Sequence, residues 1–172
     1  MTDRFAHHLR LDQIRDGERL DLIADDAERA GIAKRLALPS LDRFEAHVCL
    51  GRTGDLIRAD GRLVAALQQS CVVTGEPVAA HVDEAFAMQF VPEPPIDRAD
   101  EEIELGEGDC DTIFYDGAVI DLGAAVADTL ALSLDPYPRS AGADAALREA
   151  GVLTEEQASP FAVLAKLRKD TD

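Results

Sequence analysis

The residue with the clearest chemical potential is Cys71, which ends an apolar run and precedes a tight polar turn. A thiol can act as a nucleophile, ligate a metal or fill a small core position, and each role needs different neighbours. A nucleophile needs a base, and His81 and Asp83 are the candidates nearby in the sequence. Alternation places both on the side opposite Phe86 and Phe90, facing solvent. We find no local feature, such as a helix N-terminus, that would lower the thiol pKa, so the pattern predicts no catalytic residue.

A metal site at Cys71 would need further ligands. Structural zinc sites usually take four Cys or His side chains, with close pairs such as Cys-x-x-Cys. The partner position of such a pair is Thr74, and neither Cys49 nor Cys110 has a paired neighbour. The sequence therefore predicts a structural cysteine, no metal site and no cofactor.

The segment 68–78 that carries Cys71 is predicted to be a β-hairpin. Apolar residues of one parity lie on each side of it, namely Leu63, Ala65, Leu67, Val78, Ala80, Val82, Phe86, Met88 and Phe90. A period of two is expected of half-buried strands. Between the two runs, Gly75 can take a positive φ and Pro77 fixes its own φ, so the chain can reverse here without strain.

Other strands are expected on the same grounds. An opening strand is predicted over 4–14. A longer strand is predicted over 41–52, with Phe44, Ala46, Val48 and Leu50 facing inward, and a turn at 53–55 connects it to the run that ends at Cys71. Short apolar runs at 112–115 and 118–120 flank an Asp116-Gly117 turn signal. Consecutive strands joined by short turns indicate an antiparallel β meander, of five to seven strands, which could curl toward a barrel.

Helices complete an α+β fold. One is predicted over 25–36 with Asp25 or Asp26 as its cap, and a second begins after the cap Asp121. Both are expected to pack on the sheet. A short C-terminal helix is predicted over 159–167, where serine precedes proline.

Length and composition indicate one cytoplasmic domain. The chain has 172 residues, three cysteines without paired spacing, no signal-peptide pattern and no apolar run of membrane-spanning length. We therefore predict a single domain over 1–172, with a mobile acidic arm at about 92–111 and a partly ordered tail at about 140–172. With 34 acidic and 17 basic residues, the net charge of −17 disfavours binding nucleic acid over a broad surface.

Two segments are candidate partner-binding surfaces. The acidic arm either docks a basic partner or serves as a solvated linker, and the closing helix docks either on its own domain or on a partner. The side chains that would make these contacts are Glu101, Glu102, Glu104, Glu107, Phe161, Leu164 and Leu167.

The order of these features carries a family resemblance. The features are the Cys71-Val-Val-Thr74-Gly75-Glu76-Pro77 hairpin, the strand ending at 86–90, the acidic insertion, the Ile120-Asp-Leu-Gly123 helix start and the closing segment 160–167. Together they resemble the YceD family, the large ribosomal RNA subunit accumulation proteins, over about 4–169. Many members look to have a second cysteine three residues after the first and further cysteine in the tail, which suggests a metal site. This chain has Thr74 there and no cysteine beyond Cys110, so it resembles a variant without the metal.

The resemblance implies a non-enzymatic role in ribosome biogenesis that promotes accumulation or processing of large-subunit ribosomal RNA. The charge favours contact with a basic ribosomal protein or precursor particle, because complementary charge speeds encounter and masks the partner from RNA. The alternative is an RNA-binding module that uses a local patch of Arg43, Arg52, Arg58 and Arg62. A third hypothesis is an enzyme that uses Cys71. No membrane partner is expected.

Overall fold

The computed structural model describes residues 5–93 and 111–152. The chain divides into two compact units, unit 1 with Met1–Gln69 and Ala79–Pro136, and unit 2 with Ser70–Val78 and Tyr137–Asp172. The described elements are β1 (His8–Arg10), β2 (Glu18–Ile23), α1 (Asp26–Arg35), β3 (Ser40–Thr53), β4 (Leu56–Ser70), β5 (Pro77–Pro92), β6 (Asp111–Tyr115), β7 (Val119–Asp121), α2 (Leu122–Ser133) and α3 (Ala143–Glu149). The single-domain prediction stays a prediction.

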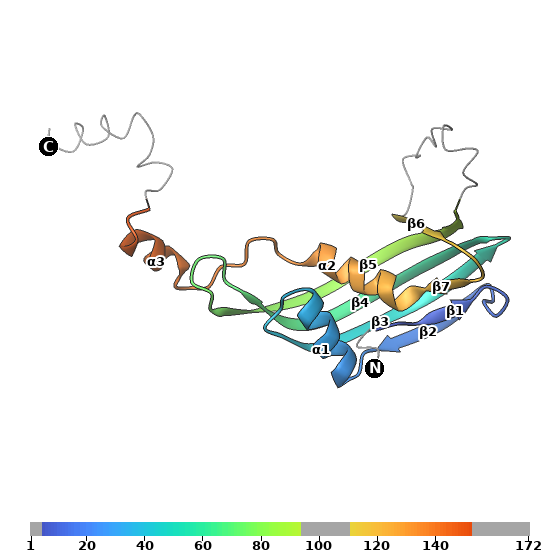
Figure 1. The fold of residues 1–172 in the computed structure, drawn as a ribbon, viewed down its shortest axis with the longest axis horizontal. Helices are drawn as coiled ribbons and strands as arrows, with labels where there is room; N and C mark the ends of the chain where they lie inside the picture. Colours follow the sequence, from blue (N-terminus) through green and yellow to red (C-terminus); the bar gives the residue numbers. More distant parts are fainter. Residues whose placement is uncertain (1–4, 94–110, 153–172) are drawn as a thin grey trace, which may run out of the picture. The chain divides into compact units, whose positions relative to one another are not determined.

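The main sheet has the strand order β2-β3-β4-β5-β6, and β1 pairs with β7 in a separate two-stranded sheet (Figure 1). The pairs β2–β3 and β3–β4 are antiparallel, whereas β5 and β6 run parallel. A parallel pair needs a long connection, which the segment 93–110 between the two strands supplies. The predicted α+β class is confirmed, and the sheet is open, with β2 and β6 at its edges.

The core of unit 1 lies on one face of this sheet. The alternating residues Phe44, Ala46, Val48 and Leu50 of β3 are all buried, as their parity predicts. Helices α1 and α2, which lie in front of the sheet in Figure 1, contribute side chains such as Ile32 and Leu130 to the same core. Each helix therefore buries an apolar edge against the strands.

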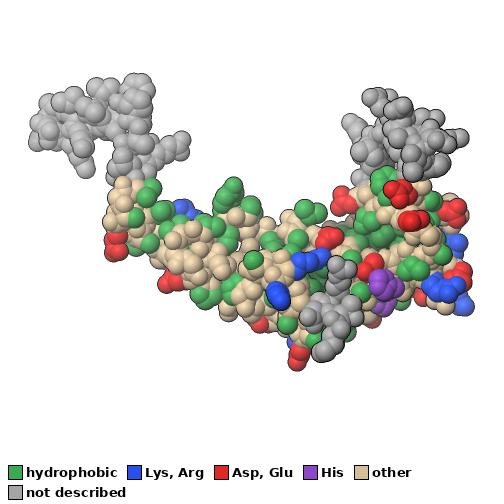
Figure 2. All heavy atoms as spheres, viewed as in Figure 1, with side chains coloured by type: hydrophobic (Ala, Val, Ile, Leu, Met, Phe, Trp, Pro, Cys, Tyr) green, Lys and Arg blue, Asp and Glu red, His purple; other side chains and the backbone are tan. Residues whose placement is uncertain are grey.

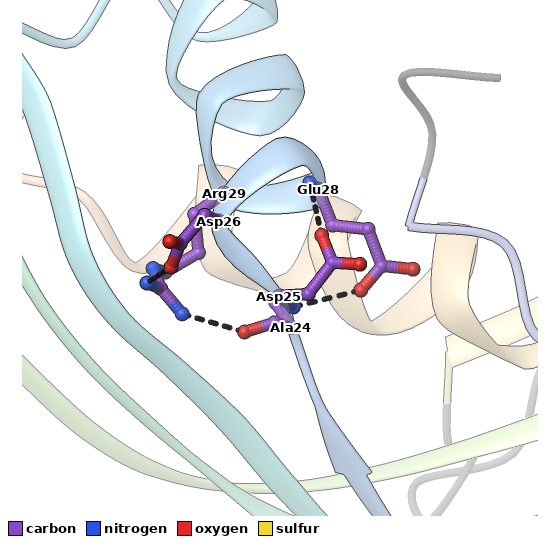
Figure 3. A network of polar contacts seen from close by, with 5 residues as sticks. All are labelled: Ala24, Asp25, Asp26, Glu28 and Arg29. Carbon is purple, nitrogen blue, oxygen red and sulfur yellow. Dashed lines mark hydrogen bonds and ion pairs between the residues drawn. The ribbon is translucent and has the colours of Figure 1, made fainter. Parts of the chain in front are cut away.

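Helix α1 begins with a capping box, shown in Figure 3. The Asp25 carboxylate accepts from the Glu28 N–H at 2.8 Å, and the Glu28 carboxylate accepts from the Asp25 N–H at 2.9 Å. Arg29 donates to the Ala24 carbonyl at 2.7 Å and pairs with Asp26. Of the two caps that the sequence allows, the structure therefore selects Asp25.

The cap leads to a stability prediction. We expect Asp25→Ala to lower the free energy of unfolding by about 1 kcal/mol, because it leaves an N–H of the first turn without its acceptor. Urea denaturation measures this change. The neighbouring Asp26→Ala removes only an exposed ion pair and should cost less. Equal costs for the two variants would contradict the assigned cap.

Some predicted elements differ from the structure. The opening strand predicted over 4–14 is only three residues long, and β2, which was not predicted, follows it. The partly ordered tail over about 140–172 stays a prediction, and the structure describes α3 within it. The predicted closing helix over 159–167 and most of the acidic arm lie outside the described residues.

Candidate functional site

The Cys71 turn is the first candidate site, and it belongs to unit 2. Its backbone is closed by two hydrogen bonds, from the Cys71 N–H to the Glu76 carbonyl at 2.8 Å and from the Gly75 N–H to the Cys71 carbonyl at 2.9 Å. Gly75 has a φ of +74°, a conformation that favours glycine. The predicted turn is therefore present, and Pro77 begins β5 directly after it.

The sulfur of Cys71 is buried, with 3% of the residue exposed, and it accepts hydrogen bonds. The Thr74 N–H lies 3.4 Å from Sγ and the Ser140 N–H lies 3.2 Å from it. A hydrogen bond from the Thr74 side chain, aided by the Ser140 amide and hydroxyl, lowers the pKa of the Cys71 thiol to about 6, against the opposing effect of desolvation. The expectation that no local feature lowers this pKa is therefore wrong.

The polar side chains beside the Cys71 turn are those of Thr74, Ser140 and Glu76. Thr74 Oγ1 lies 3.2 Å from Ser140 Oγ and donates to the Glu76 carboxylate at 3.1 Å. Zinc in structural sites takes thiolate, imidazole or carboxylate ligands, usually four Cys or His. The described residues contain no group of three or more His, Cys, Asp or Glu side chains that could hold a metal ion. One thiol, two hydroxyls and one carboxylate do not fit a structural zinc site.

Ser140 is the member of this cluster that the sequence did not reveal. It follows Pro138 in a polar stretch that the pattern assigned to the tail. One signal for Ser140 was present in the sequence. The family resemblance suggests a metal site formed with tail cysteines, and such a site would require tail residues to lie near Cys71. Because the two segments are far apart in the sequence, local patterns cannot pair them.

The Ile120–Gly123 motif forms a second site, at the start of α2. The Asp121 carboxylate caps the helix by accepting from the Ala124 N–H at 3.1 Å, and it also accepts from the His7 N–H at 3.1 Å. A Cβ on Gly123 would lie 2.6 Å from the Phe5 carbonyl oxygen, closer than such atoms pack. The motif therefore joins the N-terminal segment to α2, a structural role that explains its residue types.

A comparison with known protein families shows which family the chain belongs to. The family described as "Large ribosomal RNA subunit accumulation protein YceD" matches residues 59–168, more than half of the chain. The chain belongs to the YceD family. No curated protein and no solved structure matches the chain. The YceD match begins inside β4 and includes the Cys71 turn, β5, β6, α2 and α3, whereas β1, β2, β3 and α1 lie before it.

The arginines proposed as an RNA patch in this YceD chain are engaged by other groups. On the exposed face of the sheet, Arg43 pairs with Glu45 at 2.7 Å and Arg58 with Asp60 at 2.7 Å. Arg62 donates to Asp83 at 2.8 Å, and this hydrogen bond holds the pKa of that carboxyl below its usual range.

Arg52 is separated from these three. Its register partner is Ile57, a core residue, so alternation directs it to the opposite face. There it donates to the carbonyls of Leu11 and Gly54. The structure thus brings Arg43, Arg58 and Arg62 to one face without Arg52. Figure 2 shows the other side of the sheet, on which α1 and α2 lie, and there Lys and Arg side chains occur in small separate groups.

The carboxylates on the exposed face of the sheet extend the pairing into a row across four strands. Asp21 of β2 contacts His47 Nδ1 at 2.6 Å, and His47 lies opposite Arg62 in the register of β3 and β4. Arg62 in turn pairs with Asp83 of β5. This face pairs its basic side chains with carboxylates and is not a continuous basic surface that could track a phosphate backbone.

A pocket of about 570 Å³ lies between α1 and the start of β3 in unit 1. Ser40 is one of the residues that line this pocket. Its Oγ is buried and has no hydrogen-bond partner among the described atoms. The lining also holds Arg29, Lys34, Asp26 and Asp42. Because cations and anions are mixed there, the pocket does not select one class of ligand.

The other proposed partner-binding residues of the YceD chain lie outside the described residues: Glu101, Glu102, Glu104, Glu107, Phe161, Leu164 and Leu167. Their roles stay predictions. In the part of the chain that the structure describes, no helix is long and apolar enough to cross a membrane.

The lowered thiol pKa leads to a titration prediction. In a Cys49→Ser/Cys110→Ser background, we expect the ultraviolet absorbance of the Cys71 thiolate to appear with a midpoint near pH 6 in the folded protein. In urea the midpoint should move to about 8.5, the value of an unperturbed thiol. Because the folded-state pKa is the lower one, this group's contribution to stability is present above about pH 8.5 and is lost as the pH falls through 6. Equal midpoints in the folded and unfolded states would contradict the hydrogen-bonded sulfur.

Proposed function

We propose that this YceD-family chain is a non-enzymatic, cytoplasmic ribosome-biogenesis factor that promotes accumulation or processing of large-subunit ribosomal RNA through contact with a basic ribosomal protein or precursor particle. The observation that carries the proposal is the family match, whose description names large ribosomal RNA subunit accumulation. The form of contact is inferred from the charge of the chain.

Charge favours a protein partner over bare RNA. The net charge of −17 repels phosphate, and affinity for a phosphate backbone depends on cations that are free to neutralise it. Three of the four candidate arginines already have carboxylate partners at 2.7–2.8 Å. A basic ribosomal protein, in contrast, would be attracted by the same field.

The non-enzymatic part of the proposal rests on the surroundings of Cys71. The described hydrogen bonds to its sulfur come from Thr74 and Ser140, which supply amides and hydroxyls but no base. The lowered pKa favours the thiolate even without a base, but a reactive thiolate must also be accessible to its substrate, and Cys71 is buried. We expect cells that carry Cys71→Ser to retain accumulation of large-subunit ribosomal RNA. Loss of accumulation with a folded Cys71→Ser protein would favour the enzyme hypothesis.

The proposal is tested by measuring ribosomal RNA in cells that lack the protein. The ratio of large-subunit to small-subunit ribosomal RNA should fall, and the intact chain supplied in trans should restore it. An unchanged ratio would contradict the proposed function.

The acidic arm is the proposed contact surface. Replacement of Glu101, Glu102, Glu104 and Glu107 by glutamine should reduce capture of the basic partner, because it removes four negative charges from one segment. The matched control removes four charges from exposed positions elsewhere, by Asp42→Asn, Glu84→Gln, Asp116→Asn and Glu149→Gln. Full capture by the arm variant would remove the arm from the proposal, and equal losses in both variants would assign the effect to net charge.

The RNA-binding alternative predicts a different result. Direct phosphate contact through Arg43, Arg58 and Arg62 requires an affinity for RNA that falls steeply as salt rises. We expect no measurable binding of large-subunit ribosomal RNA fragments at low salt. Binding with a steep salt dependence, weakened by Arg62→Gln, would favour the alternative.

A further inference from the structure

Unit 2 joins two stretches of chain that are far apart in the sequence. The turn at 71–76 meets the segment that begins at Tyr137, and three polar contacts join them. The Val72 N–H donates to the Pro138 carbonyl at 2.9 Å, the Ser140 N–H donates to Cys71 Sγ at 3.2 Å, and the Thr74 and Ser140 hydroxyls lie 3.2 Å apart.

Apolar burial contributes little to this junction. Among the described residues of unit 2, the buried ones are Cys71, Pro138 and Ala143, all of them small. Hydrophobic stabilisation scales with the apolar area removed from water, so three small side chains supply a modest share. Among the described residues, the hydrogen bonds between the two stretches are therefore the main interactions that join them.

A structural metal commonly serves this purpose in small units with little apolar core. The family resemblance suggests such a metal here, with cysteine at the position of Thr74 and in the tail. In this chain Thr74 stands three residues after Cys71, and the Ser140 hydroxyl lies beside it. Neutral hydroxyls are poor zinc ligands, and Cys71 is the one thiol among the described residues of unit 2.

We propose that the hydrogen-bonded cluster of Cys71, Thr74 and Ser140 closes unit 2 without a metal ion, with the two hydroxyl side chains standing where a metal-dependent relative would place ligands. The Cys71 sulfur acts as a shared acceptor for donors from both stretches. The two hydroxyl oxygens lie 3.2 Å apart, within hydrogen-bond distance, and Thr74 Oγ1 lies 3.1 Å from the Glu76 carboxylate.

The distance between the two hydroxyl oxygens supports the proposal independently. Two sulfurs bound tetrahedrally to one zinc at 2.3 Å lie about 3.8 Å apart. The hydroxyl oxygens of Thr74 and Ser140 are 3.2 Å apart, and a C–S bond is longer than a C–O bond. Cysteine at both positions would therefore bring three sulfurs within reach of one metal ion, beside the Glu76 carboxylate.

Hydrogen exchange of the full-length protein tests the metal-free closure. The reporter is the amide of Val72, which donates across the junction. In the intact chain its protection should be the same with added Zn²⁺ and with a chelator. Thr74→Val and Ser140→Ala should each speed its exchange about fivefold, as expected for the loss of one ordinary hydrogen bond. Cys49→Ser, which changes an exposed thiol in unit 1, is the matched control and should have no effect.

Two results of this experiment would overturn the proposal. One is a chelator-dependent loss of Val72 protection in the intact chain, which would show a metal at the junction. The other is unchanged protection in both hydroxyl variants, which would show that the cluster does not close unit 2.

Cobalt binding tests the positions of the hydroxyls. The Thr74→Cys/Ser140→Cys variant should bind Co²⁺ with thiolate-to-metal charge-transfer absorbance, and Co²⁺ should raise Val72 protection in that variant alone. The intact chain should give no such absorbance. A double variant that folds, as judged by its circular dichroism, but does not bind Co²⁺ would overturn the assignment of these positions.

Discussion

Phe44→Ala should lower the free energy of unfolding of unit 1 by about 3–5 kcal/mol. Phe44 is 1% exposed at the centre of the core, and its ring meets the ring of Phe5 edge to face, with centroids 5.1 Å apart. Truncation removes buried apolar area and leaves a cavity that the strands around it cannot fill. Urea denaturation, followed by circular dichroism, measures the change.

The matched control is Phe114→Ala in β6. Phe114 is 51% exposed, so the same chemical change removes little buried surface. Its cost should stay within about 0.5 kcal/mol. A cost for Phe44→Ala as small as that of the control would show that β3 does not face the core as described.

Gly61→Ala should lower the free energy of unfolding by about 1–3 kcal/mol, because the added methyl group overpacks the site. A Cβ at Gly61 would lie 2.5 Å from the His47 carbonyl oxygen and 2.6 Å from the Phe86 ring. The ring can move, but the carbonyl belongs to the partner strand, which pairs Val48 with Gly61. Relief therefore requires a shift of the β3 or β4 backbone.

Gly51→Ala is the control for this prediction, because it lies in the same pair of strands. A Cβ there would meet its nearest atoms, on Asp16 and Arg58, at 3.6 and 3.7 Å, which are ordinary contact distances. The change should therefore stay within about 0.5 kcal/mol. Denaturation curves in which Gly61→Ala is as stable as Gly51→Ala would refute the close packing of Phe86 over the backbone.

The periodic parts of this fold could be predicted from the sequence. Alternation assigned Phe44, Ala46, Val48 and Leu50 to the core, and the structure confirms each of them. The caps Asp25 and Asp121 are likewise confirmed, because a cap depends on side chains only a few residues away. Local chemistry therefore predicted what local interactions decide.

Strand pairing depends on distant partners, and it was harder to predict. The Asp116-Gly117 turn signal separates β6 from β7, yet β6 pairs with β5 and β7 pairs with β1. The short strand β2 was missed because half of its sequence, Glu-Arg-Leu-Asp-Leu-Ile, is polar and Leu22 is its one buried residue. Its pairing with β3 stabilises it more than its own propensity does.

At the Cys71 site, too, some features could be predicted from the sequence and others could not. The turn and its glycine were predicted, because turn chemistry is local. The lowered thiol pKa was not predicted: its largest cause is the nearby Thr74 side chain, which sequence alone does not orient toward the sulfur, and the second donor residue, Ser140, lies 69 residues away in the chain. Whether the arginines form a basic patch also depends on partners from other strands, such as Asp83 beside Arg62. Alternation along one strand does not reveal such partners.

Affinity capture of the full chain from cells at physiological salt, with and without ribonuclease, tests the proposed role most directly. We predict that a basic large-subunit ribosomal protein, or a precursor particle that contains it, is captured and that this protein remains bound after ribonuclease treatment. Capture that disappears with ribonuclease, or capture of ribosomal RNA without a ribosomal protein, would contradict contact through a basic protein partner.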